Sequence, residues 1–245
     1  MTAESKPGLW VCLSPALLPL YDIGHCAVVI IDVLRATSTI ATALHHGASR
    51  VIPVASVEAC IRIGASLQAI TAGERDGIIA PGLQQGNSPF EYPPEFIRGK
   101  TLVLTTTNGT RLLHMASGAA EILTGSFPNL SSVCTYLQER QLPVVLACAG
   151  WKDRINLEDT LFAGAVVHRL KNAFQVDCDA ALMAESLYRQ AEQDLFAAIR
   201  NATHFHRLAR FGLEKDIRYC LTADVAPALP LLQGEALVDH QRAPA

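Results

Sequence analysis

Short apolar segments alternate with longer amphipathic segments along most of this chain. The clearest apolar segment, Ala27–Ile31 (AVVII), is rich in β-branched residues, and a helix-like segment follows it to about His46 and stops at Gly47. Such alternation is typical of βαβ units and of a largely parallel sheet. It predicts further strands at residues 10–13, 50–54, 69–72, 101–105, 121–123 and 143–148.

The helical periodicity predicts an α/β fold, with a mostly parallel central sheet, flanking helices and a helical C-terminal third. Ser56 is placed to cap one helix. The predicted helices cover residues 57–67, 110–116, a segment from about 130, and then 157–171, 180–201 and 203–210. We expect residues 1–245 to form a single domain, of one or two lobes, with a polar tail after Gly234 that frays.

Composition narrows the functional classes. A net charge of −3 gives no basic excess for nucleic acid or a membrane surface, and no apolar run reaches the length of about 18 residues that a membrane span needs. Ser14, Pro15 and Pro19 interrupt the apolar N-terminal stretch, so we expect a cytoplasmic protein without a signal peptide. The seven cysteines are scattered singly, which argues against a disulfide framework or a zinc site.

Polar residues gather after five of the predicted strands. Ligands of open α/β sheets bind beyond the carboxyl ends of the strands, so these clusters predict one polar cleft. The long segment 73–100, rich in Gly and Pro and without a clear period, is expected to add a functional loop. The clusters are Asp32 with Arg35, Glu74 with Arg75 in GERDG, TTTNGTR (105–111), TGSFPN (124–129), and the segment after Cys148 that reaches Glu158 and Asp159.

The segment TTTNGTR has the composition of an anion site. Asn108 and Gly109 tolerate positive φ, so the turn can aim backbone N–H groups at an anion, and Arg111 adds a planar fork of donors. The alternative is an ordinary Asn-Gly turn with a solvated arginine.

Carboxylates supply the second chemical signal. Asp32, Glu74, Glu158 and Asp159 fall at the expected cleft edge, and hard oxygen ligands of this kind suit magnesium. A metal ion with arginines and hydroxyls is suited to phosphoryl transfer or hydrolysis. The alternatives are that Asp32 only caps a helix and that Glu158 and Asp159 only stabilise the first turn of one.

Cys148 and Arg154 offer a competing chemistry. Five residues separate them after a strand, a spacing that also occurs in cysteine-dependent phosphatases, in which a thiolate attacks phosphorus. The loop between them holds Trp151 rather than a dense run of small residues, and Ile155 follows the arginine. A buried cysteine at a strand end is the alternative.

Taken together, the motifs resemble the 2-phosphosulfolactate phosphatase (ComB) family. The resemblance runs from about Val28 to Leu232, and Asn156 departs from it where a Ser or Thr is expected. It implies a magnesium-dependent phosphatase that converts (2R)-2-phospho-3-sulfolactate to 3-sulfolactate, a step of the coenzyme M biosynthesis type. The motifs that carry it are IDVLRATST, GERDG, GNSP, GKTLVLTTTNGTR, TGSFPN, CAG…NLEDTLFAG and GLEKDIRYCLTAD.

The resemblance also implies roles for particular residues. Asp32, Glu74 and Asp159 are expected to anchor Mg²⁺ and, with Arg35, to form the catalytic set. The expected contacts to a small anionic phosphorylated substrate come from Arg75, Asn87, Ser88, Thr107, Asn108, Gly109, Arg111 and Ser126.

Three questions stay open at this point. The substrate can be another small phosphorylated hydroxy acid. A non-catalytic anion-binding protein is a further alternative, although clustered carboxylates would hinder pure anion binding. The apolar segment 157–170 suits either the core or the interface of a homodimer.

Overall fold

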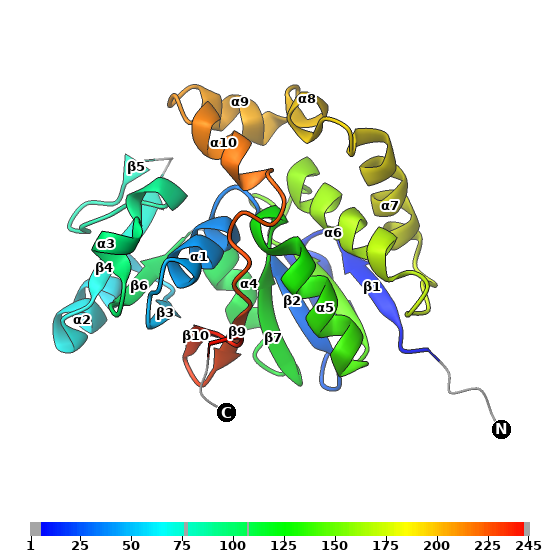
Figure 1. The fold of residues 1–245 in the computed structure, drawn as a ribbon, viewed down its shortest axis with the longest axis horizontal. Helices are drawn as coiled ribbons and strands as arrows, with labels where there is room; N and C mark the ends of the chain where they lie inside the picture. The colour runs from blue at the N-terminus through cyan, green and yellow to red at the C-terminus, as the bar shows by residue number, and fades with distance from the viewer. Residues whose placement is uncertain (1–5, 76–77, 107, 243–245) are drawn as a thin grey trace.

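The computed structural model describes residues 6–75, 78–106 and 108–242, and ten strands of this part form one mixed sheet (Figure 1). On one side, β1, β8, β2 and β7 lie in that order and run parallel, with bounds Leu9–Cys12, Val144–Cys148, Ala27–Ile31 and Glu121–Gly125. On the other side, β3, β6 and β4 are also parallel, with bounds Arg50–Pro53, Thr101–Thr105 and Ile70–Arg75, and β5 (Ile78–Ile79) pairs antiparallel with β4. The predicted α/β class with a mostly parallel sheet is confirmed.

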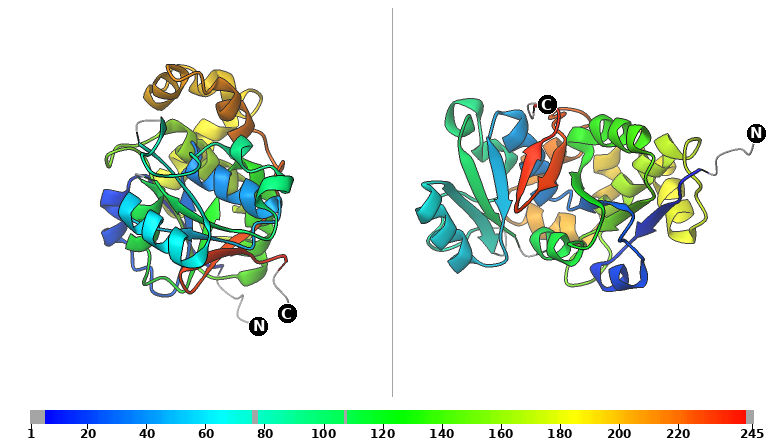
Figure 2. Two further views of the ribbon diagram at one scale, coloured as in Figure 1. Left: turned by 90° about the vertical axis from the view of Figure 1, so that its left-hand side faces the viewer. Right: turned by 90° about the horizontal axis from the view of Figure 1, so that it is seen from below.

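A C-terminal hairpin joins the two parallel halves. Strand β9 (Pro230–Gln233) pairs antiparallel with β7, and β10 (Ala236–Asp239) pairs antiparallel with both β9 and β3. Figure 2 shows this hairpin, in red, between the two halves. The prediction that the tail after Gly234 frays is wrong, because a tight turn at Gly234 (φ +60°) returns the chain and buries Leu237 completely within the sheet.

Strand β2 is buried on both faces because helices cover each side of it. Successive side chains of a strand point to opposite faces, and accordingly Val29 and Ile31 pack into one hydrophobic cluster while Val28 and Ile30 pack into another. The first cluster includes side chains of α5 (Leu130–Arg140), α6 (Leu157–Leu170) and α7 (Asp179–Ala191), and the second those of α1 (Ala36–His45) and α4 (Gly109–Met115).

Most of α6 is buried in the core of this single chain, which answers the question about its packing, whereas the homodimer stays a prediction. Ser56 caps α2 (Val57–Leu67) as expected, since its hydroxyl accepts a 3.1 Å hydrogen bond from the Ala59 N–H.

Two further segments differ from the predictions. The single helix expected over 180–201 is two helices, α7 and α8 (Leu195–Ile199), because the Asp194 carboxylate accepts a 2.9 Å hydrogen bond from the Ala197 N–H and starts a new helix. The segment 73–100, in which the sequence predicted no regular structure beyond residue 72, contains the end of β4, β5, a 3₁₀ turn (Pro89–Glu91) and α3 (Pro94–Ile97). Two other 3₁₀ turns lie at Pro15–Leu20 and Phe127–Asn129.

Helices α8, α9 (Thr203–Ala209) and α10 (Glu214–Cys220) lie on the side of the sheet where β2 ends, at the top of Figure 1. The C-terminal region is thus helix-rich, as predicted, until the final hairpin. In the described residues, every helix is too short or too polar to cross a membrane.

Candidate active site

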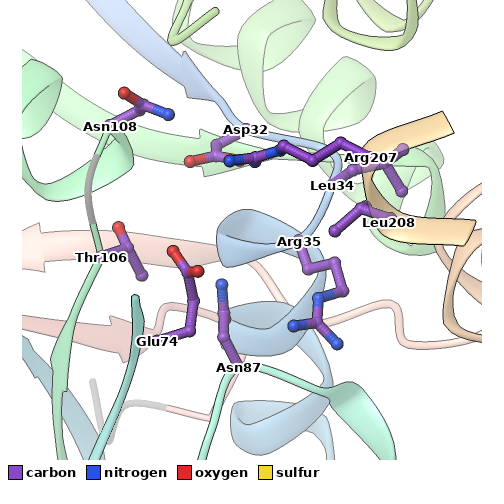
Figure 3. A pocket seen from close by; sticks show the side chains of 9 residues that line it. All are labelled: Asp32, Leu34, Arg35, Glu74, Asn87, Thr106, Asn108, Arg207 and Leu208. Carbon is purple, nitrogen blue, oxygen red and sulfur yellow. The ribbon is translucent and has the colours of Figure 1, made fainter. Parts of the chain in front are cut away.

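A polar pocket lies where β2, β4 and β6 end, beside helix α9 (Figure 3). Three of the five predicted clusters contribute to it, although they come from both parallel halves of the sheet. The loop before α3 and helix α9 supply the rest of the wall. The lining residues are Asp32, Leu34, Arg35, Glu74, Asn87, Thr106, Asn108, Arg207 and Leu208.

The first turn of α1 holds Asp32 at the end of β2. Both the backbone N–H and the hydroxyl of Thr37 donate to the Asp32 carbonyl, at 3.0 and 2.9 Å, and the Ala36 N–H donates to the carboxylate. Burial raises the pKa of Asp32 to about 6, and the nearby carboxylates of Glu74 and Glu158 act in the same direction. Asp32 is therefore a buried carboxylate whose charged form a cation would stabilise.

Gly109 brings the start of α4 against this carboxylate. A Cβ atom at position 109 would lie 2.8 Å from Asp32 Oδ2, so only a glycine fits here without a shift. The expected positive-φ turn is not what this glycine provides, because neither Asn108 (φ −114°) nor Gly109 has a positive φ. Thr107, a predicted substrate contact, lies outside the described residues.

Arg35 is buried and paired. Its guanidinium Nη1 lies 2.5 Å from Asp216 Oδ2, and the two side chains are 5% and 9% exposed. Asp216 belongs to α10, so this ion pair joins the loop after β2 to the C-terminal helices. The positive charge that Arg35 brings to the pocket wall is balanced by this carboxylate.

Glu74 and Asn87 form the wall opposite α9 in Figure 3. The Asn87 backbone carbonyl accepts a 3.2 Å hydrogen bond from the Thr39 hydroxyl, whereas its buried side-chain oxygen has no hydrogen-bond partner in the described residues. An amide with an unpartnered buried oxygen, in a pocket that two carboxylates also line, is an arrangement that a bound cation would complete. Within the described residues, no group of three or more His, Cys, Asp and Glu side chains has the geometry of a metal site.

Besides Gly109, four described residues that were predicted to contact the substrate lie outside the pocket lining. Arg111 is half exposed and pairs with Asp153 at 2.9 Å. The other three mainly support local structure: Arg75 donates to the Glu74 carbonyl, Ser88 accepts from the Phe90 N–H, and Ser126 forms a capping box with Asn129.

Asp159 ties the loop after β2 to the loop after β8. Its Oδ1 accepts a 2.9 Å hydrogen bond from the Val33 N–H, after β2, and its Oδ2 accepts a 3.0 Å bond from the Gly150 N–H, after β8. Burial and the adjacent Glu158 raise the pKa of Asp159 well above its usual range. The structure therefore gives both oxygens backbone partners, and metal ligation by Asp159 stays a prediction.

The geometry around Cys148 does not favour nucleophilic chemistry. Cys148 is fully buried in β8, burial raises the pKa of its thiol well above the usual value, and Arg154 is exposed. A buried, protonated thiol is a poor nucleophile.

The sequence did not predict that Arg207 lines the pocket or that His204 lies next to it. Arg207 lines the pocket from α9, and its neighbour His204, which the sequence did not place in the site, is buried against Glu158. The detectable signal was the spacing of three residues between His204 and Arg207, which puts both on one helix face.

Comparison with known proteins identifies the family of this chain. The family model for 2-phosphosulpholactate phosphatase matches residues 12–235. The chain belongs to the 2-phosphosulfolactate phosphatase family. The predicted family and the predicted class, a phosphoric monoester hydrolase, are confirmed at that level.

Three relatives show how far the similarity to this family extends, and each carries the name "Probable 2-phosphosulfolactate phosphatase". The Thermotoga petrophila protein is 44% identical over 83% of this chain and 88% of its own. The Picosynechococcus protein is 42% identical over 91% of this chain and 94% of its own. The Caldanaerobacter subterraneus protein is 38% identical over 86% of this chain and 90% of its own.

Proposed function

We propose that this protein is a magnesium-dependent phosphatase that hydrolyses (2R)-2-phospho-3-sulfolactate to 3-sulfolactate and inorganic phosphate. Membership of the family supports the reaction class, and the names of the relatives support the substrate. The observation that carries the proposal is the lining of the pocket, to which Asp32 and Glu74 contribute carboxylates and Arg207 contributes a guanidinium. Carboxylates suit a divalent cation and a guanidinium suits a phosphate or sulfonate.

The donor set fits Mg²⁺. Magnesium in proteins is usually held by one or two carboxylates, with waters and substrate oxygens completing its octahedron. Asp32 and Glu74 would supply the carboxylates, and the side-chain oxygen of Asn87, which has no partner among the described residues, would add a third hard donor. When bound, the ion would neutralise charge on the phosphoryl oxygens.

The side chains of the pocket would hold and orient the remaining groups. Thr106 and Asn108 offer a hydroxyl and an amide at the end of β6. Leu34 and Leu208 cover part of the wall with apolar surface and restrict water. As the attacking water bonds to phosphorus, either Asp32 or Glu74 accepts its proton. The bond from phosphorus to the alkoxide oxygen breaks, and that oxygen takes a proton from the same carboxyl group or from solvent to give the hydroxy acid.

The test is phosphate release by the purified protein from 2-phosphosulfolactate, with magnesium and with EDTA. Phosphoglycolate, phospholactate and p-nitrophenyl phosphate serve as competing substrates. We expect release that depends on magnesium and prefers the sulfonate. Preference for another ester would support a phosphatase with a different substrate. Release unaffected by EDTA would contradict the proposed dependence on magnesium. No release from any ester would favour a non-catalytic anion-binding protein.

Asp32→Asn tests the metal assignment directly. We expect a loss of roughly 100-fold or more in kcat/KM, since the variant loses a charged ligand in a desolvated site. The exposed Asp22→Asn is the matched control and should behave as the wild type. Normal turnover and magnesium dependence in Asp32→Asn would show that the metal is held elsewhere.

A further inference from the structure

Arg207 differs from the other arginine of the pocket wall. Arg35 is paired with Asp216, whereas in the described residues no carboxylate lies within ion-pair distance of Arg207. The Nε of Arg207 is also buried, and none of the described residues forms a hydrogen bond with it. A partly buried guanidinium that faces a polar pocket without a carboxylate partner suits an anion that enters the pocket and accepts from its N–H groups.

A chain of hydrogen bonds holds Arg207 from behind. Glu158, fully buried in the first turn of α6, places Oε1 2.5 Å from His204 Nδ1. His204 Nε2 in turn lies 2.8 Å from Nη2 of Arg207. A guanidinium can only donate, so Nε2 is the acceptor of the Arg207 bond, which assigns the imidazole proton to Nδ1, facing Glu158; the Asn156 side-chain amide also lies 3.1 Å from Nδ1.

Trp151 fixes the guanidinium from another side. The Arg207 Cζ lies 4.9 Å from the centre of the Trp151 ring, within the range of a cation–π contact. The hydrogen bond from Nη2 to His204 and the contact of the guanidinium with Trp151 together restrict the directions of the remaining N–H groups. Figure 3 shows the side chain reaching from α9 into the pocket.

We propose that Arg207 binds an anionic oxygen group of the substrate, and that Glu158 and His204 are positioning residues that orient it. This inference rests on the proposed phosphatase function. The anionic group is either the phosphoryl group or the acid group at the other end of the substrate, and both present oxygens of the same chemistry to the guanidinium.

Substitution of Arg207 tests the binding role. We expect Arg207→Ala to lower kcat/KM roughly 10- to 100-fold, as a charge-assisted hydrogen bond to substrate is lost, with partial rescue by added guanidinium ion. Arg207→Lys keeps the charge and the stem, and should retain part of the activity. The exposed Arg210→Ala of the same segment is the control. Unchanged kcat/KM in Arg207→Ala would overturn the proposal.

The substrate series identifies the end that binds. A loss for phosphoglycolate but not for p-nitrophenyl phosphate, which has no second acid group, assigns Arg207 to the acid end. An equal loss for both assigns it to the phosphoryl group.

A double-mutant cycle tests the positioning role. Glu158→Gln preserves the shape of the side chain, and we expect it to raise KM roughly threefold to tenfold in the wild type but not in Arg207→Ala. His204→Gln can still accept from Arg207 and should retain more activity than His204→Phe. Equal effects of Glu158→Gln in both backgrounds would show that Glu158 does not act through Arg207.

Anion binding separates this inference from the proposed function. If the wild type hydrolyses none of the esters, the function fails, and calorimetric binding of inorganic phosphate and of 3-sulfolactate then decides the inference. Weaker binding by Arg207→Ala than by the wild type would support it. Equal binding by the two proteins, or no binding by either, would overturn it.

Discussion

Gly109 lies against Asp32 so closely that a Cβ on the glycine would sit 2.8 Å from the carboxylate oxygen Oδ2. The start of α4 and the end of β2 are therefore adjusted to each other without space for a methyl group. The site owes part of its geometry to the absence of a side chain at this position.

Gly109→Ala should displace Asp32 and lower kcat/KM by about 10- to 100-fold, because small shifts of a catalytic group are costly. Gly118→Ala is the matched control, since a Cβ at position 118 meets nothing within 4 Å. Steady-state kinetics on both variants would check this. Equal activities of the two variants would show that the pocket accommodates a methyl group at position 109 without displacing Asp32, and would contradict the prediction.

The raised pKa of Asp32 predicts an effect on stability. Its pKa is about 6 in the folded protein, against the ordinary value of 3.8 in the unfolded chain, so between pH 4 and 6 the folded state binds more protons and stability falls as pH rises. Asp32→Asn removes this cost and should be more stable than the wild type at pH 7, by up to about 3 kcal/mol.

Urea unfolding in EDTA across this pH range would measure the effect, with Asp22→Asn as the control. The advantage of Asp32→Asn should vanish by about pH 4, where the folded wild-type protein carries a protonated carboxyl. An advantage independent of pH would contradict the assignment.

The Arg35–Asp216 pair should stabilise the attachment of α10. Asp216→Asn leaves a buried guanidinium uncompensated, and we expect a loss of about 3 kcal/mol in the free energy of unfolding. Glu214→Gln, an exposed acid of the same helix, should change it by less than about 0.5 kcal/mol. Similar stability of the two variants in urea would show that the pair is not the main link.

Substitution of Asp159 distinguishes a structural role in tying the two loops from a role as a magnesium ligand. Asp159→Asn replaces one accepting oxygen with an amide nitrogen that faces an N–H donor, which should cost about 1–3 kcal/mol of stability. If Asp159 only ties the loops together, magnesium affinity measured calorimetrically will change little. Loss of magnesium binding with stability unchanged would make it a ligand.

Cys148→Ala should leave kcat within about twofold of the wild type, because the buried thiol is protonated at neutral pH. Removal of the sulfur from the core should lower stability by about 1 kcal/mol. Phosphate release by this variant is the measurement. Loss of release in a variant that still folds would support attack on phosphorus by the Cys148 thiolate.

Local patterns in the sequence were sufficient for much of the fold and for part of the site. The apolar run Ala27–Ile31 matches β2 residue for residue, since a strand covered on both faces must be apolar throughout. Asp32, Arg35 and Glu74 reach the pocket because parallel strands present their carboxyl ends to a common edge.

Only the tertiary structure decided the rest, because the deciding contacts join residues far apart in the chain. Asp159 bonds to Val33 across 126 positions, Arg35 pairs with Asp216 across 181, and Glu158 reaches Arg207 through His204. Nothing in the local periodicity of either partner encodes such a contact. The sequence by itself determined which segments form the central strands and which polar residues follow them, whereas some strand ends, such as that of β4 at Arg75 instead of residue 72, came from the structure. Three-dimensional packing selected the residues that line the pocket and those that hold it in place.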